Sequence, residues 1–239
     1  MIGFGTILNS IAILAGGLIG MLFGKFVTAG LQDGLTKACG VSVLFIGIAG
    51  ALEKMLQIQD AAVTSTGAML IVGCLALGTL VGELINIERL FERFGCWLKA
   101  KTGNAKDGGF VDAFVSASFT VCIGAMAIVG AIEDGISGDW SILAAKAALD
   151  FIIILIMTCA MGKGCLFSAI PVAVLQGSVT LLARLLQPFM TAAALNNLSM
   201  IGSVLIFCVG VNLVWGKTLR VANMLPAVLF AILAAFLPL

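Results

Sequence analysis

The sequence contains no histidine and no tyrosine, and only 10% of its 239 residues are charged. Without histidine, a His-ligated zinc or haem site and a Ser-His-Asp triad are excluded, so we predict no metal, no cofactor and no enzymatic activity. Basic and acidic residues nearly cancel, and the net charge of +1 offers no basic surface for nucleic acid. The seven cysteines form no C-x-x-C motif, and most lie in apolar runs, where a thiol behaves as a small hydrophobe.

Apolar residues are abundant instead: 61% of the chain is hydrophobic, and the mean hydropathy is +1.19. Soluble domains carry about 45–50% apolar and about 25% charged residues, so this chain lacks the polar atoms to cover a surface exposed to water. We therefore predict an all-α, polytopic transmembrane helix bundle that forms a single integral membrane domain over residues 1–239. The lipid bilayer is its first expected partner.

Eight apolar runs of about 20 residues are separated by charged or turn-forming residues, and each is long enough to cross a bilayer. The predicted spans are Ile2–Phe23, Asp33–Leu52, Thr64–Ile85, Phe110–Ile132, Ser141–Met161, Leu166–Gln187, Leu195–Trp215 and Ala222–Leu239. Basic residues favour the odd-numbered connections by ten to three. Because cytoplasmic loops carry an excess of Lys and Arg, we predict that both termini lie outside.

The largest predicted inner loop contains an amphipathic helix over residues 84–98. Apolar side chains recur there at helical spacing, whereas Glu88, Arg89 and Glu92 lie on the other face. This pattern is typical of a helix lying in the cytoplasmic interface of the membrane. Docking of a partner protein is the alternative interpretation.

An internal repeat is indicated when residues 1–53 are laid over residues 164–216 without a gap. The alignment pairs Phe4 with Phe167, Thr28 with Thr191, and Gly47 with Gly210, among others. In the predicted topology the two copies have opposite orientations. Inverted repeats are a recurrent basis of secondary transporters, although they also occur in channels.

Glycines recur every fourth residue at Gly16, Gly20 and Gly24, and again at Gly78 and Gly82. Such spacing lets helix backbones approach closely. Packing within the chain is the first interpretation, and a homo-oligomer formed through these glycine-rich faces is the alternative.

Asp150 is the most informative polar residue, because it stands ten residues into the span Ser141–Met161. At 1.5 Å per residue it lies about 15 Å deep, near the centre of a hydrocarbon core about 30 Å thick. A carboxyl group there costs several kcal/mol unless it is neutralised, paired or hydrated, and such residues mark ion pathways or proton relays. Lys146, one helical turn earlier, is its expected partner. A purely structural ion pair is the alternative.

Other polar side chains lie at similar depth or near the span ends. Gln176 and Ser178 follow Pro171, which we expect to interrupt the sixth span, and they join Thr120 and Asn212 as candidate ligands for an ion or polar solute. Glu53 and Glu133 end the second and fourth spans in similar sequences, GALE and GAIE. They are candidates for an acidic mouth that concentrates cations.

Three glycine patterns carry a resemblance to a known family: GTILNSIAILAGGLIG at Gly5–Gly20, GIAGALE at Gly47–Glu53, and LGTLVGE at Leu77–Glu83 before the amphipathic helix. The chain resembles the YqgA/YdfK-like bacterial inner-membrane proteins, a family of unknown function, over essentially its whole length. The resemblance implies a multi-pass protein of the bacterial plasma membrane with suspected transport activity, and it supplies no site residues.

Two functional hypotheses follow. The first is a transporter or passive pathway for an ion or small polar solute, with Asp150 as the coupling or selecting charge. The sequence contains no ATPase motif, so active transport would draw on an ion gradient. The second is a membrane scaffold without transport activity that recruits a partner through residues 84–98.

Overall fold

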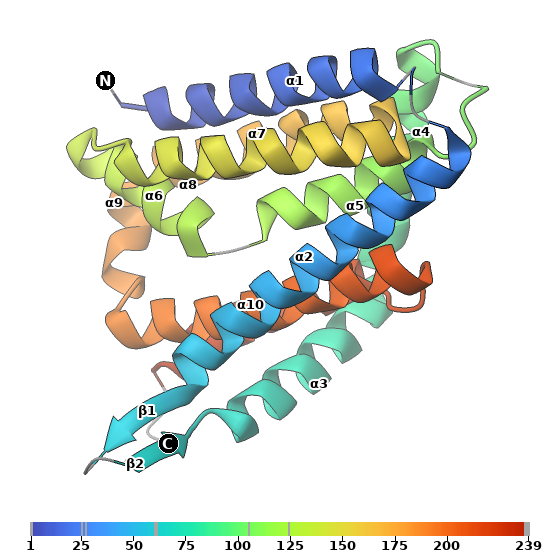
Figure 1. Cartoon of the computed structure of the whole chain (residues 1–239). Coiled ribbons are helices and arrows are strands. Elements are labelled where there is room, and N and C mark those ends of the chain that lie inside the picture. Colours follow the sequence, from blue (N-terminus) through green and yellow to red (C-terminus); the bar gives the residue numbers. More distant parts are fainter. Residues whose placement is uncertain are drawn as a thin grey trace.

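Long apolar helices lying side by side make up most of the protein (Figure 1). The computed structural model describes residues 2–24, 26, 28–59, 62–104, 106–123 and 125–236. Six helical segments are long and apolar enough to cross a membrane, and a bent pair can form a seventh span. This confirms an all-α, polytopic bundle. The six are α1 (Phe4–Gly24), α2 (Ala29–Met55), α3 (Ala68–Ile85), α7 (Ser141–Met161), α8 (Ala169–Leu181) with the 3-10 helix η1 (Lys163–Ser168) before it, and α10 (Ala192–Trp215).

Shorter elements complete the described chain. A two-stranded antiparallel sheet follows α2, with Leu56 of one strand opposite Ser65 of the other. These elements are β1 (Leu56–Gln59), β2 (Ala62–Ser65), α4 (Ile87–Lys101), α5 (Phe110–Cys122), α6 (Ala125–Ser137), α9 (Ala183–Leu186), the 3-10 helix η2 (Gln187–Phe189), α11 (Val221–Met224) and α12 (Pro226–Ala234).

The chain enters and leaves the bundle at the same end. In Figure 1, α1 begins and α12 ends at the left, which we call the terminal end, whereas α4 lies at the right, which we call the α4 end. Helices α11 and α12 form one shorter apolar segment, Val221–Ala234, in place of the predicted span Ala222–Leu239, so the described residues contain six or seven segments long enough to cross a membrane where eight were predicted. Residues 237–239 of that span, and Lys25 among the counted basic residues, lie outside the described residues.

Two predicted boundaries were wrong near α3. The third span begins at Ala68 and not at Thr64, because Thr64 pairs with Gln57 in the small sheet. The amphipathic helix occupies residues 87–101 and not 84–98. Asn86 separates it from α3: its backbone has a left-handed φ of 57°, its N–H closes the end of α3, and its side chain caps Arg89.

Helix breaks differ from those expected. The predicted span Phe110–Ile132 consists of two helices, α5 and α6, whose axes differ by 61°. Pro171 does not interrupt the sixth span, because it lies in the first turn of α8, where the missing N–H has no intrahelical partner to lose. That span breaks instead at Leu182, between α8 and α9.

Helix α4 is not isolated in the interface but packs on α5. Phe91 meets Phe119 edge to face at 4.9 Å between ring centroids, and Phe94 lies 5.8 Å from Phe114. The scaffold hypothesis assigns partner contact to this helix; Phe91 is partly buried against α5, whereas Phe94 and Trp97 are exposed.

Glycines bring helix backbones into direct contact within the chain. A Cβ at Gly16 or Gly20 would lie 2.5–2.6 Å from the carbonyl oxygens of Phe151 or Leu155 on α7. On α3, Gly82 packs against the backbone of Asn223. The glycine faces predicted from the sequence are thus used inside the bundle.

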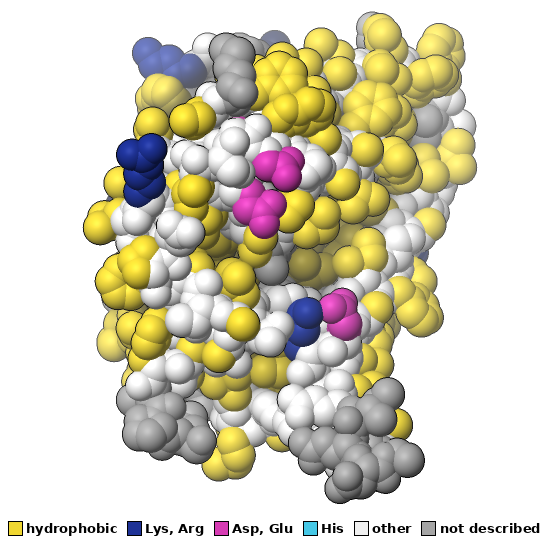
Figure 2. All heavy atoms as spheres, turned by 90° about the vertical axis from the view of Figure 1, so that its left-hand side faces the viewer, with side chains coloured by type: hydrophobic (Ala, Val, Ile, Leu, Met, Phe, Trp, Pro, Cys, Tyr) yellow, Lys and Arg dark blue, Asp and Glu magenta, His cyan; other side chains and the backbone are white. Residues whose placement is uncertain are grey.

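Apolar side chains also cover much of the outside of the bundle, as membrane lipid requires. Large hydrophobic residues on α1, α2 and α3 are exposed, including Leu18, Phe45 and Val72. Figure 2 looks onto the terminal end of the bundle, where hydrophobic side chains also outnumber the few charged ones.

We predict that Gly82→Ala lowers the free energy of unfolding by about 1–3 kcal/mol, because the added methyl would overlap the Asn223 carbonyl oxygen. Gly73→Ala on the same helix is the matched control, since nothing lies within 4 Å of its added Cβ. Denaturant titration in micelles, followed with a thiol-reactive dye that reaches buried cysteines on unfolding, measures both. Equal stabilities of the two variants would contradict the packing argument.

Candidate functional site

A buried ion pair lies in the middle of α7. The Lys146 Nζ is 2.6 Å from the Asp150 Oδ2, and the two residues are 7% and 3% exposed. Asp150 is the tenth residue of this 21-residue helix, so it lies near mid-membrane. The i, i+4 spacing places both side chains on one face, where each neutralises the other in a medium that strongly disfavours lone charges.

The same ammonium closes the end of a broken helix. Lys146 Nζ also donates to the Val121 carbonyl oxygen at 2.8 Å, in the last turn of α5. The last four carbonyls of a helix have no intrahelical partner and carry partial negative charge. A lysine from α7 therefore stabilises the break between α5 and α6 from the side.

Two amides complete what we call the central polar cluster, Asn9, Lys146, Asp150 and Gln176. Asn9 of α1 donates from Nδ2 to Asp150 Oδ2 at 3.0 Å and to Gln176 Oε1 of α8 at 3.3 Å. Both amides are buried, yet Asn9 Oδ1 and Gln176 Nε2 have no hydrogen-bond partner among the described residues. One acceptor and one donor beside Asp150 are thus left unsatisfied, which is uncommon for buried polar atoms.

The cluster is buried in this structure, with none of its four residues more than 7% exposed. Asp150 contacts Lys146 and Asn9, and it lines none of four cavities found among the described residues. A hydrated cavity at Asp150, which an open pathway requires, is therefore not seen. The arrangement fits either an occluded state or a structural ion pair.

Two further predicted ligands, Thr120 and Ser178, make no hydrogen bond to the cluster. Thr120 on α5 is buried and donates to the Ser116 carbonyl oxygen of its own helix. Ser178 on α8 is exposed and donates to Leu175 O; it lines an apolar groove with Pro171. Both hydroxyl groups donate within their own helices and not to Asp150.

The remaining predicted residues lie at the ends of the bundle. Glu53 is exposed and pairs with Lys54, whereas Glu133 lines a hollow of about 250 Å³ with Ser137 and Gln187. They share no cavity among those described, so the structure does not bring the proposed acidic mouth together. Asn212, at the α4 end, binds the following loop through Thr218 and Leu219.

Sequence reasoning missed three buried polar residues. Asn9 was not among the candidate ligands, and its signal was its position as an amide in the mainly apolar run Ile2–Phe23. Asp134 is fully buried and accepts from the Gly3 and Gly5 N–H groups at the start of α1. Glu88 is 6% exposed, although its charge had suggested a solvated face.

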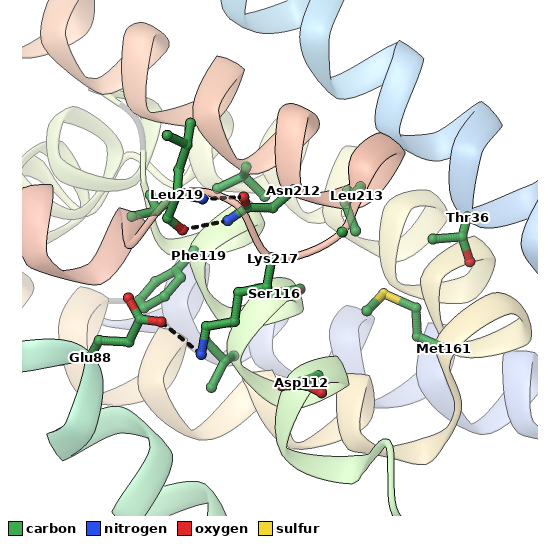
Figure 3. A pocket seen from close by; sticks show the side chains of 14 residues that line it. Thr36, Glu88, Asp112, Ser116, Phe119, Met161, Asn212, Leu213, Lys217 and Leu219 are labelled. Carbon is green, nitrogen blue, oxygen red and sulfur yellow. Dashed lines mark hydrogen bonds and ion pairs between the residues drawn. The ribbon is translucent and has the colours of Figure 1, made fainter.

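Glu88 belongs to a cavity of about 280 Å³ at the α4 end, drawn in Figure 3. Its carboxylate lies 2.7 Å from Lys217 Nζ, and Lys217 also pairs with Glu92 one turn along α4. Partial burial lowers the pKa of Lys217, but its hydrogen bonds to Glu88 and Glu92 outweigh this and raise the pKa above its ordinary value. Lys217 is therefore charged at neutral pH.

Comparison with known proteins places the chain among membrane proteins. Residues 4–236 match the family described as "Protein of unknown function (DUF554)". The chain is 27% identical to the uncharacterized membrane protein YdfK of Bacillus subtilis, over 95% of this chain and 93% of the relative. It is 28% identical to the uncharacterized protein YqgA of Escherichia coli, over 95% and 94%. No solved structure matches.

We predict that Lys146→Met and Asp150→Leu each lower the free energy of unfolding by about 3–5 kcal/mol, because each leaves a buried charge without its partner. The double variant should lose clearly less than the sum of the two. The exposed pair Asp33–Lys37 has the same i, i+4 separation and is the control cycle, with an expected coupling of about 0–1 kcal/mol. Additive losses at 146 and 150 in denaturant titrations would argue against a coupled pair.

Proposed function

We propose that this chain, which belongs to the DUF554 family, is a transporter or passive pathway for an ion or small polar solute and not an enzyme. It is a multi-pass membrane protein by its helices and by its likeness to a named membrane protein. The observation that carries the proposal is the pair of unsatisfied amide atoms, Asn9 Oδ1 and Gln176 Nε2, beside the mid-membrane carboxylate of Asp150.

A cluster with unsatisfied polar atoms lowers the stability of the fold if its role is only structural. An unsatisfied buried polar atom costs about 1–3 kcal/mol, and an apolar core of the same shape would avoid that cost. A guest that both donates and accepts hydrogen bonds would satisfy Asn9 and Gln176 together. The closed cluster then corresponds to an occluded state, with a cavity at the α4 end and a hollow at the terminal end.

The contacts between α2 and α10 support duplication. A Cβ at Gly47 would meet the Phe207 N atom at 2.5 Å, and a Cβ at Gly210 would meet the Leu44 N atom at 2.8 Å. In the alignment of residues 1–53 with 164–216, positions 47 and 210 are equivalent, and so are 44 and 207. Exchanging equivalent residues turns one contact into the other, as expected at an interface with two-fold rotational symmetry.

A second pair of contacts follows the same rule. Gly40 packs on Leu213, and Gly50 packs on Ser203; positions 40 and 203 are equivalent, as are 50 and 213. The helix starts agree too, because the equivalent residues Thr28 and Thr191 cap α2 and α10 with their side chains.

Helices α2 and α10 run in opposite directions in Figure 1, and they form one of the most extensive helix contacts of the protein. A two-fold axis between them would lie across the helices, so the two copies would be inverted relative to the membrane. We propose that these inverted repeats let the protein exchange two shapes that open at opposite ends. The broken pair α5–α6, beside the cluster, is a further feature shared with transporter sites.

For orientation we propose that the α4 end faces the cytoplasm of a bacterial inner membrane and that both termini lie outside, because basic residues gather in the loops at that end. Reporter fusions after Gly103, in the loop between α4 and α5, should report a cytoplasmic location, and fusions after Ser137 an external one. Reporters on the same side in both fusions would refute this topology.

We predict that the purified protein in liposomes gives ion or solute flux that falls at least about tenfold in Asp150→Asn, because the neutral amide removes the charge that selects or couples. Candidate ions and small polar solutes are screened with entrapped indicators or isotopes. Asn9→Ala should also reduce flux, since it removes the amide that orients Asp150.

Asp33→Asn is the matched control, because Asp33 makes an i, i+4 pair with a lysine on the exposed surface. Its flux should equal that of the original protein. Thermal unfolding of each variant confirms that lost flux does not reflect lost folding. Full flux in a folded Asp150→Asn variant would remove Asp150 from the mechanism.

A further inference from the structure

The cavity at the α4 end combines a buried carboxylate with an apolar wall. It lies between α4, α5, α7 and α10 and the loop after α10, and its volume is about 280 Å³. This is just below the range of about 300–1,000 Å³ that is typical of small-molecule pockets, so the cavity suits only a small ligand. Figure 3 shows Glu88 and Lys217 pointing toward each other, with Phe119, Met161 and Leu213 among the apolar residues around them.

Unmatched negative charge faces this cavity. Glu88 Oε1 pairs with Lys217, but Glu88 Oε2 is buried and has no partner among the described residues. Asp112, an exposed residue in the first turn of α5, also lines the cavity, and its carboxylate makes no hydrogen bond or ion pair with the residues that the structure describes. A buried carboxylate oxygen without a donor is strongly disfavoured, so it points to a cationic or hydrogen-bond-donating ligand.

The protein already places an ammonium group beside Glu88. Lys217 comes from the loop that follows Gly216, and this single cation is shared between Glu88 and Glu92. Asn212 holds the loop through hydrogen bonds with Thr218 and Leu219. The Lys217 ammonium group thus makes the ion pair with Glu88 that the ammonium group of a free amine would make.

A metal ion fits less well. Among the residues that the structure describes, no three acidic or cysteine side chains converge as a metal site would require. A divalent ion at Glu88 would also lie next to the lysine ammonium.

We propose that this cavity binds a small protonated primary amine, whose ammonium group contacts Glu88 and whose apolar part contacts Phe119, while Asp112 adds negative charge to the lining. Lys217 is then a tethered competitor that the free amine displaces. The assignment of this amine as the transported solute rests on the proposed function; the binding site itself does not.

The test is amine binding by purified full-length protein in detergent, measured by isothermal titration with propylammonium chloride. Lys217→Ala should bind about tenfold more tightly than the original protein, because it removes a competitor present at millimolar effective concentration. Glu88→Gln in the Lys217→Ala background should abolish this gain. Asp112→Asn should weaken binding, and since Asp112 is exposed this variant is expected to fold even if Glu88→Gln is unstable.

Two controls separate a site from a general charge effect. Lys37→Ala removes a positive charge near the same end of the bundle, from an exposed pair, and should leave amine affinity unchanged. Sodium and potassium chloride at equal concentration should not reproduce the gain in Lys217→Ala. An equal gain with these salts, or propylammonium binding that is unchanged in Lys217→Ala and Asp112→Asn, would overturn the proposal.

Flux measurements distinguish this proposal from the previous one. If amine binds but does not cross liposome membranes, the site stands and amine transport is refuted. If flux of another solute depends on Asp150 while propylammonium does not bind, the transport proposal stands and the amine site is refuted.

Discussion

The ammonium group of Lys146 is the constraint on which the interior of this protein depends. It neutralises Asp150 within α7 and caps a carbonyl at the end of α5, so one cation satisfies two groups that lipid or apolar side chains could not. Through Asn9 and Gln176 the same network reaches α1 and α8. Four helices are therefore held in a mutual arrangement by hydrogen bonds, at a depth where water is scarce and such bonds are strong.

Around this polar centre the helices are held by close backbone contact. Glycines seat α1 on α7, α2 on α10, and α3 on α11 and α12. Contacts of this kind depend on shape and tolerate sliding poorly, since each glycine faces a particular backbone atom of its neighbour. The contacts between α2 and α10 are reciprocal, because Gly47 meets Phe207 and Gly210 meets Leu44.

Hydropathy predicted the architecture well, and α7 was predicted to the residue, because burial in lipid leaves a long apolar signal bounded by charged or turn residues. The i, i+4 spacing likewise predicted the Lys146–Asp150 contact. Tertiary contacts left no such signal. The break after Cys122 shows in the sequence only as a glycine within an apolar run, and it is stabilised by a lysine 25 residues away. From its position in the helical pattern, Glu88 looks like a surface charge. It is buried because α5 and the distant loop 216–220 lie around it.

The hydrogen bonds between Asp134 and the start of α1 have a consequence for how the protein inserts into the membrane. Its carboxylate accepts the N–H groups of Gly3 and Gly5, about 130 residues upstream. As translation proceeds, the first helix inserts well before this carboxylate has been synthesised, so headgroups or water must solvate its leading turn in the meantime. The hydrogen bonds that Asp134 accepts from the start of α1 therefore form only after α6 has been synthesised.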